Sequence, residues 1–265
     1  MTNRKLIFVF LFTLLLSSCA KVPITGRRQL KLLPESMLMN MSLASYNEFL
    51  STNKVVPSSN PNAKMVSEVG NKIAGAVFSY MEENKIKNKS FNFEFNVVEN
   101  NQVNAWCMPG GKVVFYTGIL PIAKDAEGIA VVMGHEIAHA LANHGNERMS
   151  QQMALILGGI TLDVALHEKP QETKDIFLMA YGVGGNLGML AYSRKHEYEA
   201  DKLGMVLMAM AGYNPERALS FWQEMSRMEA PGQIALLSTH PSGEARVKAI
   251  RDFLPEAMKY YRSRK

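Results

Sequence analysis

The spacing of apolar side chains predicts a mainly helical domain with a few short strands. Residues 34–50 and 60–84 have apolar positions three and four apart, which is the spacing of amphipathic helices. Residues 91–99, FNFEFNVVE, alternate apolar and polar side chains, as a half-buried strand does. From residue 125 the pattern is helical almost to the C-terminus. We therefore expect an α+β fold in which helices predominate.

A turn signal divides the next apolar stretch, residues 104–120. Pro109-Gly110-Gly111 separates two short runs of strand-forming residues, and the second run covers residues 112–116. This spacing favours a hairpin. We expect a small antiparallel sheet that packs against the helices.

Two later stretches are apolar enough to be tested as membrane spans. Residues 153–166 form a short stretch that carries Asp163, and residues 176–192 are uncharged but only 17 long and rich in glycine. A helix needs about 20 apolar residues to cross a bilayer. Both stretches are better interpreted as buried helices of one domain.

The sequence MGHEIAHALANHG, residues 133–145, concentrates side chains that can do chemistry. On a helix, His135 and His139 lie about 40° apart on one face, so both imidazoles can reach the same metal ion. Glu136 lies beside them, where it can take a proton from water, as in H-E-x-x-H zinc sites. The alternative is a polar patch on a surface helix. A buried helix, whose polar groups need partners, is favoured by the apolar neighbours Ile129, Ala130, Val131, Val132, Met133, Ile137, Ala138 and Leu141.

A third ligand can come from SRKHEYEADKLG, residues 193–204, which offers His196, Glu197, Glu199 and Asp201. Glu197 and Asp201 are four apart and share a helix face, whereas Glu199 points about 200° away from Glu197. Two buried carboxylates repel each other unless a positive charge lies nearby, and a metal with its histidines would supply that charge. Asp201 could then accept the second N–H of a ligand imidazole. The alternative is a solvated run of charges.

One zinc protease layout can be excluded from the spacing alone. The pattern H-E-x-x-H-x-x-G-x-x-H requires glycine at position 142 and histidine at position 145, where this chain has Ala142 and Gly145. His144 lies five residues beyond His139 and is interpreted as a helix cap or a supporting group rather than a ligand.

The N-terminus has the pattern of a lipoprotein signal peptide, which we assign to residues 1–18. Two basic residues precede an apolar run at residues 6–16, and LSSC then ends on Cys19, which would carry the lipid. An ordinary signal peptide or a short membrane anchor is the alternative. We expect residues 19–33 to form a tether that packs on the domain, and residues 34–265 to form the domain itself.

Composition adds three constraints. The chain has 265 residues and 47% hydrophobic content, enough for one large domain. Removal of the signal would leave a mild excess of basic over acidic residues, without the basic stripe that nucleic-acid binding requires. Once Cys19 is lipidated, Cys107 is the only other cysteine, so no disulfide is expected within the chain, and Cys107 is interpreted as a buried apolar residue.

HEIAHALANH, followed 58 residues after His139 by the Glu197 of EYEAD, resembles the gluzincin family of the CAAX prenyl endoprotease and the mitochondrial Oma protease. PITGRRQL, NAWCMPGGKVVFYTGIL and THPSGEARVKAI resemble its branch of exported bacterial lipoproteins. The resemblance implies a zincin-like domain with its sheet beside the active-site helix. It also implies one zinc ion per chain bound by His135, His139 and Glu197, with Glu136 as the catalytic base and Asp201 in support. The prenyl protease has many membrane spans that this chain lacks, so cleavage of prenylated proteins is not implied.

Further roles are open alternatives. His240 is a candidate donor to the oxyanion of the reaction, with Arg246 as a weaker candidate that would otherwise support the site. His240 could instead fill the open metal position at rest, or be an ordinary loop histidine. The run Val113, Val114, Phe115 and Tyr116 could offer a strand edge to an extended peptide substrate, or could simply be a core strand.

These observations predict a zinc endopeptidase, held by lipid in the bacterial cell envelope, that cleaves unfolded or misassembled envelope proteins. The reaction class follows from the residues, and the quality-control role from the resemblance alone. The alternative is a non-proteolytic binding or assembly factor for envelope proteins with a structural or latent zinc site. Ala20 after the lipidated cysteine favours a periplasm-facing position on the outer membrane over the inner one. Substrate identity and oligomeric state are not predicted.

Overall fold

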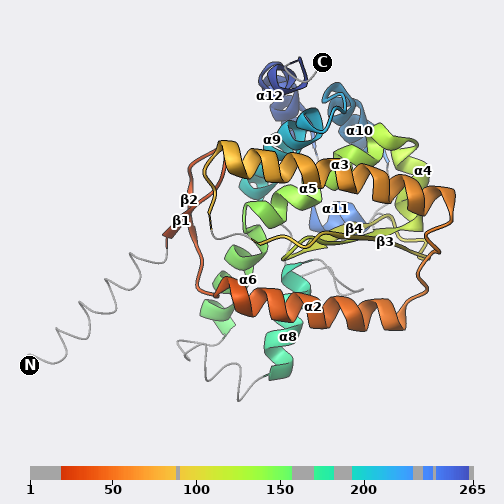
Figure 1. Ribbon diagram of the computed structural model, residues 1–265. Coiled ribbons are helices and arrows are strands. Elements are labelled where there is room, and N and C mark those ends of the chain that lie inside the picture. The colour runs from red at the N-terminus through yellow and green to blue at the C-terminus, as the bar shows by residue number, and fades with distance from the viewer. Residues whose placement is uncertain are drawn as a thin grey trace, which may run out of the picture.

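The computed structural model describes residues 19–87, 90–156, 170–181, 193–228, 235–240 and 243–262 (Figure 1). The expected signal peptide and most of the two apolar stretches tested above lie outside these ranges. Within them, no helix combines the length and the apolar character that crossing a bilayer requires.

Two long helices precede the sheet. The helix α2 covers Glu35–Thr52 and α3 covers Pro61–Glu83. The helix α3 begins at Asn60, whose side chain accepts a hydrogen bond from the backbone N–H of Asn62, and its first residue is a proline, which needs no hydrogen-bond partner there.

Three strands form one mixed sheet: β3 (Glu94–Val98), β4 (Ala105–Met108) and β5 (Lys112–Tyr116). The β4–β5 hairpin turns through Gly110 and Gly111, which both have positive φ angles that glycine adopts without strain. Since β4 occupies one side of β5, β3 pairs on the other side and runs parallel to it. The α+β class is confirmed, but the sheet is mixed rather than wholly antiparallel.

The expectation that β5 offers an edge to substrate is wrong. Val113, Val114, Phe115 and Tyr116 lie on the central strand, between β3 and β4, so both backbone edges already have strand partners. Alternate side chains of the sheet enter two different cores. Val113 and Phe115 face the core made with α3 and the later helices, and Val114 and Tyr116 face the core made with α2. Cys107 is buried in the first core, as expected.

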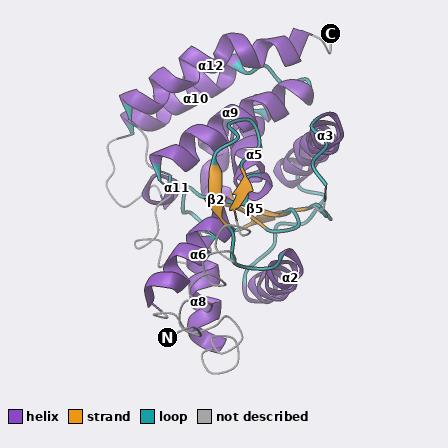
Figure 2. Ribbon diagram, turned by 90° about the vertical axis from the view of Figure 1, so that its left-hand side faces the viewer, coloured by secondary structure: helices purple, strands orange, loops and turns teal. Residues whose placement is uncertain are grey.

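The remaining helices pack on these layers. The helix α5, which contacts β4 and α3, crosses α9 at Gly134 and Gly204, where the backbones are close enough that an added Cβ would lie within 3 Å of backbone atoms of the other helix. Figure 2 shows α10 and α12 beyond α9, on the side of α5 away from α6 and α8. The helical elements that follow the sheet in the chain are η1 (Thr117–Ile119), α4 (Leu120–Ala123), α5 (Ala126–Leu141), α6 (His144–Ile156), α8 (Pro170–Ala180), α9 (Arg194–Met210), α10 (Glu216–Arg227), α11 (Ala235–Thr239) and α12 (Glu244–Arg262).

The segment expected to be a tether is folded onto the domain. It forms an antiparallel pair of short strands, β1 (Cys19–Lys21) and β2 (Arg28–Leu30), and β2 contacts α6. The backbone N–H of Leu32 donates to Ser150 Oγ over 3.0 Å, and Asn146 Nδ2 donates to the carbonyl of Leu33 over 2.9 Å.

Candidate metal centre

The helix α5 supplies three of the candidate side chains. It begins at Asp125, whose carboxylate accepts the backbone N–H of Gly128 over 2.8 Å, and it runs through the buried centre of the domain. His135, Glu136 and His139 are each at most 3% exposed. The polar groups of this helix therefore lie in the interior, where each needs a partner.

The helix α9 supplies the facing carboxylates. Ser193 Oγ accepts the backbone N–H of His196 and begins the helix, so that Glu197 falls in its first turn. Glu197 and Asp201 both face α5 and are 1% and 6% exposed. Because Gly134 and Gly204 allow the helices to approach closely, the carboxylates come within reach of the α5 histidines.

Four side chains converge on one point. His135 Nε2 lies 3.1 Å from His139 Nε2 and 3.4 Å from Glu197 Oε2, and His139 Nε2 lies 3.4 Å from Glu197 Oε1. His240, which follows α11, brings Nδ1 to 3.1 Å from both His135 Nε2 and Glu197 Oε1. One potential ligand atom from each of the four residues lies within 4.8 Å of the others.

The donor set fits a zinc-like metal ion. A tetrahedral zinc with bonds of about 2.0–2.1 Å holds its ligand atoms roughly 3.3 Å apart, which is close to the spacings between these nitrogens and oxygens. Imidazole nitrogens with one carboxylate oxygen are ligands that zinc prefers. His135, His139 and Glu197 could therefore hold a metal ion, with His240 close enough to be a fourth donor.

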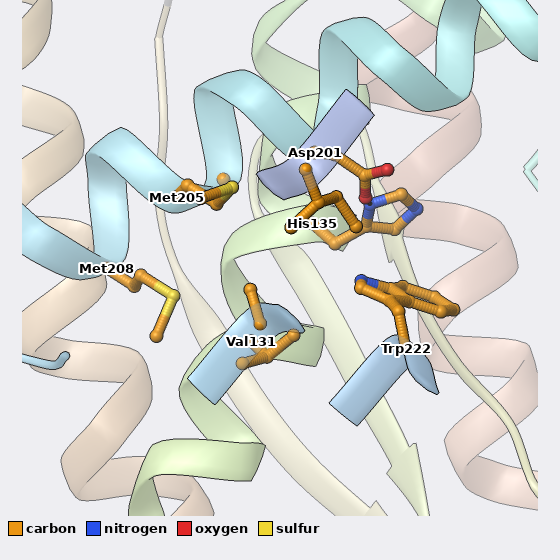
Figure 3. Close-up of a pocket in the computed structure, with 9 residues that line it drawn as sticks. Val131, His135, Asp201, Met205, Met208 and Trp222 are labelled. Atoms are coloured by element: carbon orange, nitrogen blue, oxygen red, sulfur yellow. Dashed lines mark ion pairs between the residues drawn. The ribbon is translucent and has the colours of Figure 1, made fainter. Parts of the chain in front are cut away.

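Asp201 and Arg246 brace the side of His135 away from this point. Asp201 Oδ1 lies 2.9 Å from His135 Nδ1, and Arg246 Nε and Nη2 each donate to the Asp201 carboxylate over 2.8 Å. Figure 3 shows the Asp201 carboxylate beside the His135 ring, with the Trp222 indole close to it. The Arg246 guanidinium lies 3.4 Å from the centre of that indole ring.

Arg246 also contacts Glu197, since its Nη1 lies 2.9 Å from Glu197 Oε2. Its positive charge therefore lies between the two carboxylates of α9. The sequence led us to expect that a metal ion and its histidines would compensate these carboxylates. Arg246 supplies part of that compensation through contacts with both carboxylates, and its role as a donor to an oxyanion stays a prediction.

Burial and charge set the protonation of the cluster. Burial lowers the pKa of His135, but its contacts with Asp201 and Glu197 outweigh burial and raise that pKa to about 9. Burial raises the pKa of Glu197, but the charges of His240 and Arg246 hold it well below its usual range. Glu197 is thus ionised, as a metal ligand must be, and a metal ion would compete with a proton for His135.

Glu136 lies at the edge of the cluster. Its Oε1 is 3.5 Å from His240 Nε2, and it has no hydrogen-bond partner among the residues that the structure describes. Burial raises the pKa of its carboxyl group. A buried carboxylate oxygen without a partner beside a metal-binding point is suited to accept a proton from a bound molecule.

Two further histidines that the sequence links to this site are His240 and His144. His240 lies in the cluster itself, which is compatible with the resting-state role, while the oxyanion role stays a prediction. His144 is neither a cap nor a ligand: α5 ends at Leu141, Asn143 turns the chain with a φ of 59°, and His144 begins α6. Its Nδ1 lies 3.0 Å from His139 Nδ1.

Sequence reasoning missed two contributors to this region. Arg27, in PITGRRQL, forms ion pairs with Glu147 and Glu199, and Trp222 packs against both His135 and Arg246. In the sequence, the motif around Arg27 points only to the family resemblance, and the charge of Arg27 does not indicate a distant buried partner. Trp222 lies on a strongly amphipathic helix and offered no signal beyond that of a core residue.

Comparisons with known proteins agree with this geometry. The sequence profile described as Peptidase family M48 matches residues 63–254. The Mitochondrial metalloendopeptidase OMA1 of Schizosaccharomyces pombe is 33% identical over 246 residues, 89% of this chain and 66% of that protein.

Two more distant relatives carry different names. The mitochondrial Metalloendopeptidase OMA1 of Homo sapiens is 30% identical over 265 residues, 96% of this chain and 48% of that protein. The Beta-barrel assembly-enhancing protease of Escherichia coli is 28% identical over 171 residues, 60% of this chain and 34% of that protein. The chain thus spans between about a third and two thirds of the length of these relatives. Since the matched profile covers both the α5 motif and the α9 carboxylates, the chain belongs to peptidase family M48.

Proposed function

We propose that this protein is a zinc-dependent endopeptidase of the bacterial cell envelope that hydrolyses peptide bonds in unfolded or misassembled proteins. The observation that carries the proposal is the convergence of His135, His139 and Glu197 on one point, with the Glu136 carboxylate at its edge. The family gives the class of reaction and implies a metal.

His135, His139 and Glu197 would hold the ion, and Asp201 would keep the His135 ring oriented through Nδ1. When bound, zinc supplies Lewis acidity, which makes water a better nucleophile at neutral pH and polarises a peptide carbonyl. Glu136 takes the proton of the attacking water and passes it to the leaving amine. Its raised pKa suits both steps, because the group must accept and then release a proton near neutral pH.

An extended substrate could pair only with an outer strand of the sheet. On the side of the sheet that contacts α5, the outer strand is β4, Ala105–Met108. Pairing through the main chain is almost independent of sequence, which suits the cleavage of unfolded polypeptides. We therefore transfer the substrate-binding role from β5 to β4.

The envelope location is supported by two observations of different kinds. The N-terminal pattern ends on Cys19 as a lipoprotein signal does, and two of the relatives are named Beta-barrel assembly-enhancing protease. The relatives with the higher identities are mitochondrial by name, so the substrates and membrane of this chain are proposed from the bacterial relatives and the N-terminus together.

The test is a Glu136→Gln variant of the full chain, incubated with casein after loading with zinc. We expect the wild type to release fragments that mass spectrometry detects and a chelator prevents. Glu136→Gln should retain its zinc and release none, while Glu68→Gln, an exposed change on α3, should cleave normally. Full cleavage by Glu136→Gln would remove this residue from the mechanism.

The second candidate is a binding or assembly factor with a closed zinc site. It is favoured by His240, whose Nδ1 lies 3.1 Å from two of the other donors, because structural zinc sites have four protein ligands. If His240 only closes the site at rest, His240→Ala should still cleave casein. Intact casein with the wild type and with His240→Ala, both loaded with zinc, would favour the binding factor.

A further inference from the structure

Behind His139, on the ring edge away from the metal-binding point, lies a second buried polar cluster. It contains His144, His196, Glu147 and Glu199, which are all at most 5% exposed. His144 and His196 stack with ring centres 4.6 Å apart. His144 Nε2 lies 3.0 Å from Glu199 Oε2, and His196 Nε2 lies 3.0 Å from Glu147 Oε2. The mechanism above uses none of these groups.

Arg27 joins the two carboxylates of this cluster. Its Nη1 and Nη2 donate to the two oxygens of Glu147 over 2.8 and 2.7 Å, and its Nε and Nη2 donate to the two oxygens of Glu199 over 2.9 and 3.0 Å. Thr25 Oγ1 donates to Glu199 Oε1 over 2.7 Å. One planar guanidinium therefore orients both carboxylates, and only a forked donor can do so.

These contacts determine which nitrogen of His139 carries hydrogen. Glu199, ionised beside Arg27, can only accept, so His144 must donate to it from Nε2. A neutral imidazole with hydrogen on Nε2 has a lone pair on Nδ1, and that atom lies 3.0 Å from His139 Nδ1. His139 must then carry its hydrogen on Nδ1, which leaves the Nε2 lone pair directed at Glu197 and His135.

Arg27 reaches this position because the N-terminal segment is folded. The β1–β2 pair closes through a turn in which Val22 N–H donates to the Arg27 carbonyl over 2.8 Å, and Val22 is itself 2% exposed. Leu32 and Leu33 then fix the following residues to α6 through Ser150 and Asn146. The hairpin that carries Arg27 begins at Cys19, and the residues that follow it are held against α6.

We propose that Arg27 is a positioning residue for the metal ligand His139: acting through Glu199 and His144, it fixes the tautomer that presents Nε2 to the ion. The proposal rests on the proposed metal site. It makes Arg27, through the folded segment that carries it, a support of the metal centre, because the tautomer of His139 is fixed only when Arg27 is docked against Glu199.

The test compares Arg27→Ala and Arg27→Gln with Arg28→Ala in the full chain. Arg28 is the next residue and is exposed, so its replacement removes the same charge without touching the cluster. Zinc affinity is measured by competition with a chromophoric chelator. The tautomer of His139 is measured in the metal-free protein by long-range proton–nitrogen NMR correlation with ¹⁵N-labelled histidine.

We expect Arg28→Ala to match the wild type in both measurements. Arg27→Ala should bind zinc about 10- to 100-fold more weakly, as loss of a group that orients a metal ligand does, and its His139 should show both tautomers. Arg27→Gln, which preserves most of the side-chain volume, should also bind zinc more weakly and show both tautomers of His139. It replaces Arg27→Ala as the test if Arg27→Ala does not fold. Arg27→Lys should lie between Arg27→Gln and the wild type, because an ammonium retains the charge without the fork.

Folded Arg27 variants with wild-type zinc affinity and a single Nδ1–H tautomer of His139 would overturn the proposal. Failure of the proposed function would give results that differ from these. If the wild type binds no zinc, the metal site itself is refuted; if it binds zinc and cuts no casein, the protease is refuted while the role of Arg27 is still measured by affinity and tautomer.

Discussion

The crossing of α5 and α9 makes the metal centre sensitive to a single methyl group. A Cβ added at Gly204 would lie 2.9 Å from both the carbonyl carbon of Gly134 and the backbone nitrogen of His135, whereas ordinary contact begins at 3.4 Å. Backbone atoms cannot rotate away, so the helices must separate by about 0.5 Å in Gly204→Ala. That movement draws Glu197 away from His135 and His139. A metal site tolerates changes in its metal–ligand distances of only about 0.2 Å.

The cost can be bounded from known magnitudes. Overpacking of this kind costs about 1–3 kcal/mol. If the metal-free protein relaxes by separating the helices, zinc must bring them back together, and its affinity falls about 5- to 150-fold. If the metal-free protein does not relax, the strain lowers its free energy of unfolding instead. The roughly 1 kcal/mol by which alanine is more favourable than glycine in a helix offsets part of that loss.

Two measurements therefore cover both outcomes: zinc affinity by chelator competition, and thermal unfolding of the metal-free protein. Gly75→Ala is the matched control, because Gly75 lies in α3 and, among the described residues, no atom outside its own stretch of helix comes within 4 Å of the added Cβ. This change should raise stability slightly. If Gly204→Ala retained wild-type zinc affinity and gained the same stability as Gly75→Ala, the close crossing would have no role in the site.

Three further predictions concern the groups around the site. Asp201→Asn, which removes the carboxylate beside His135 Nδ1, should weaken zinc binding about 10- to 100-fold in chelator competition, and unchanged affinity would contradict the bracing role. Removal of the metal should lower thermal stability: at a zinc concentration 100 times Kd, binding contributes about 2.7 kcal/mol, or roughly 5–10 °C in Tm, and an unchanged Tm on chelation would mean that no such site is filled. Burial raises the pKa of Glu147, but hydrogen bonds from Arg27 and His196 outweigh it and lower that pKa from 4.5 to about 2. The unfolded carboxylate titrates near pH 4.5, so the stability that ionised Glu147 contributes is present above pH 4.5 and is lost as the pH falls towards 2. Urea titrations at several pH values should show that Glu147→Gln reduces the dependence of the unfolding free energy on pH in this window. The same dependence in the variant and the wild type would refute the assignment.

Local patterns in the sequence were sufficient for the elements that carry the site. The i, i+4 spacing placed His135 with His139 and Glu197 with Asp201, because helix geometry relates residues one turn apart whatever surrounds them. The 112–116 strand, the hairpin before it and the helix at residues 60–84 were also predicted, since each depends on residues close together in the chain. Glu199 was correctly placed on the face away from Glu197 for the same reason.

Tertiary structure alone decided which distant segments meet. The side of β5 on which β3 pairs depends on the path of the connection between β3 and β4, and no alternation of side chains reveals it. The four-residue cluster requires α5, α9 and the residue after α11 to converge, and the Arg27 contacts join residues more than a hundred positions apart. A guanidinium and a carboxylate attract each other at any separation in sequence, so their pairing is determined by how the helices pack and not by a local pattern.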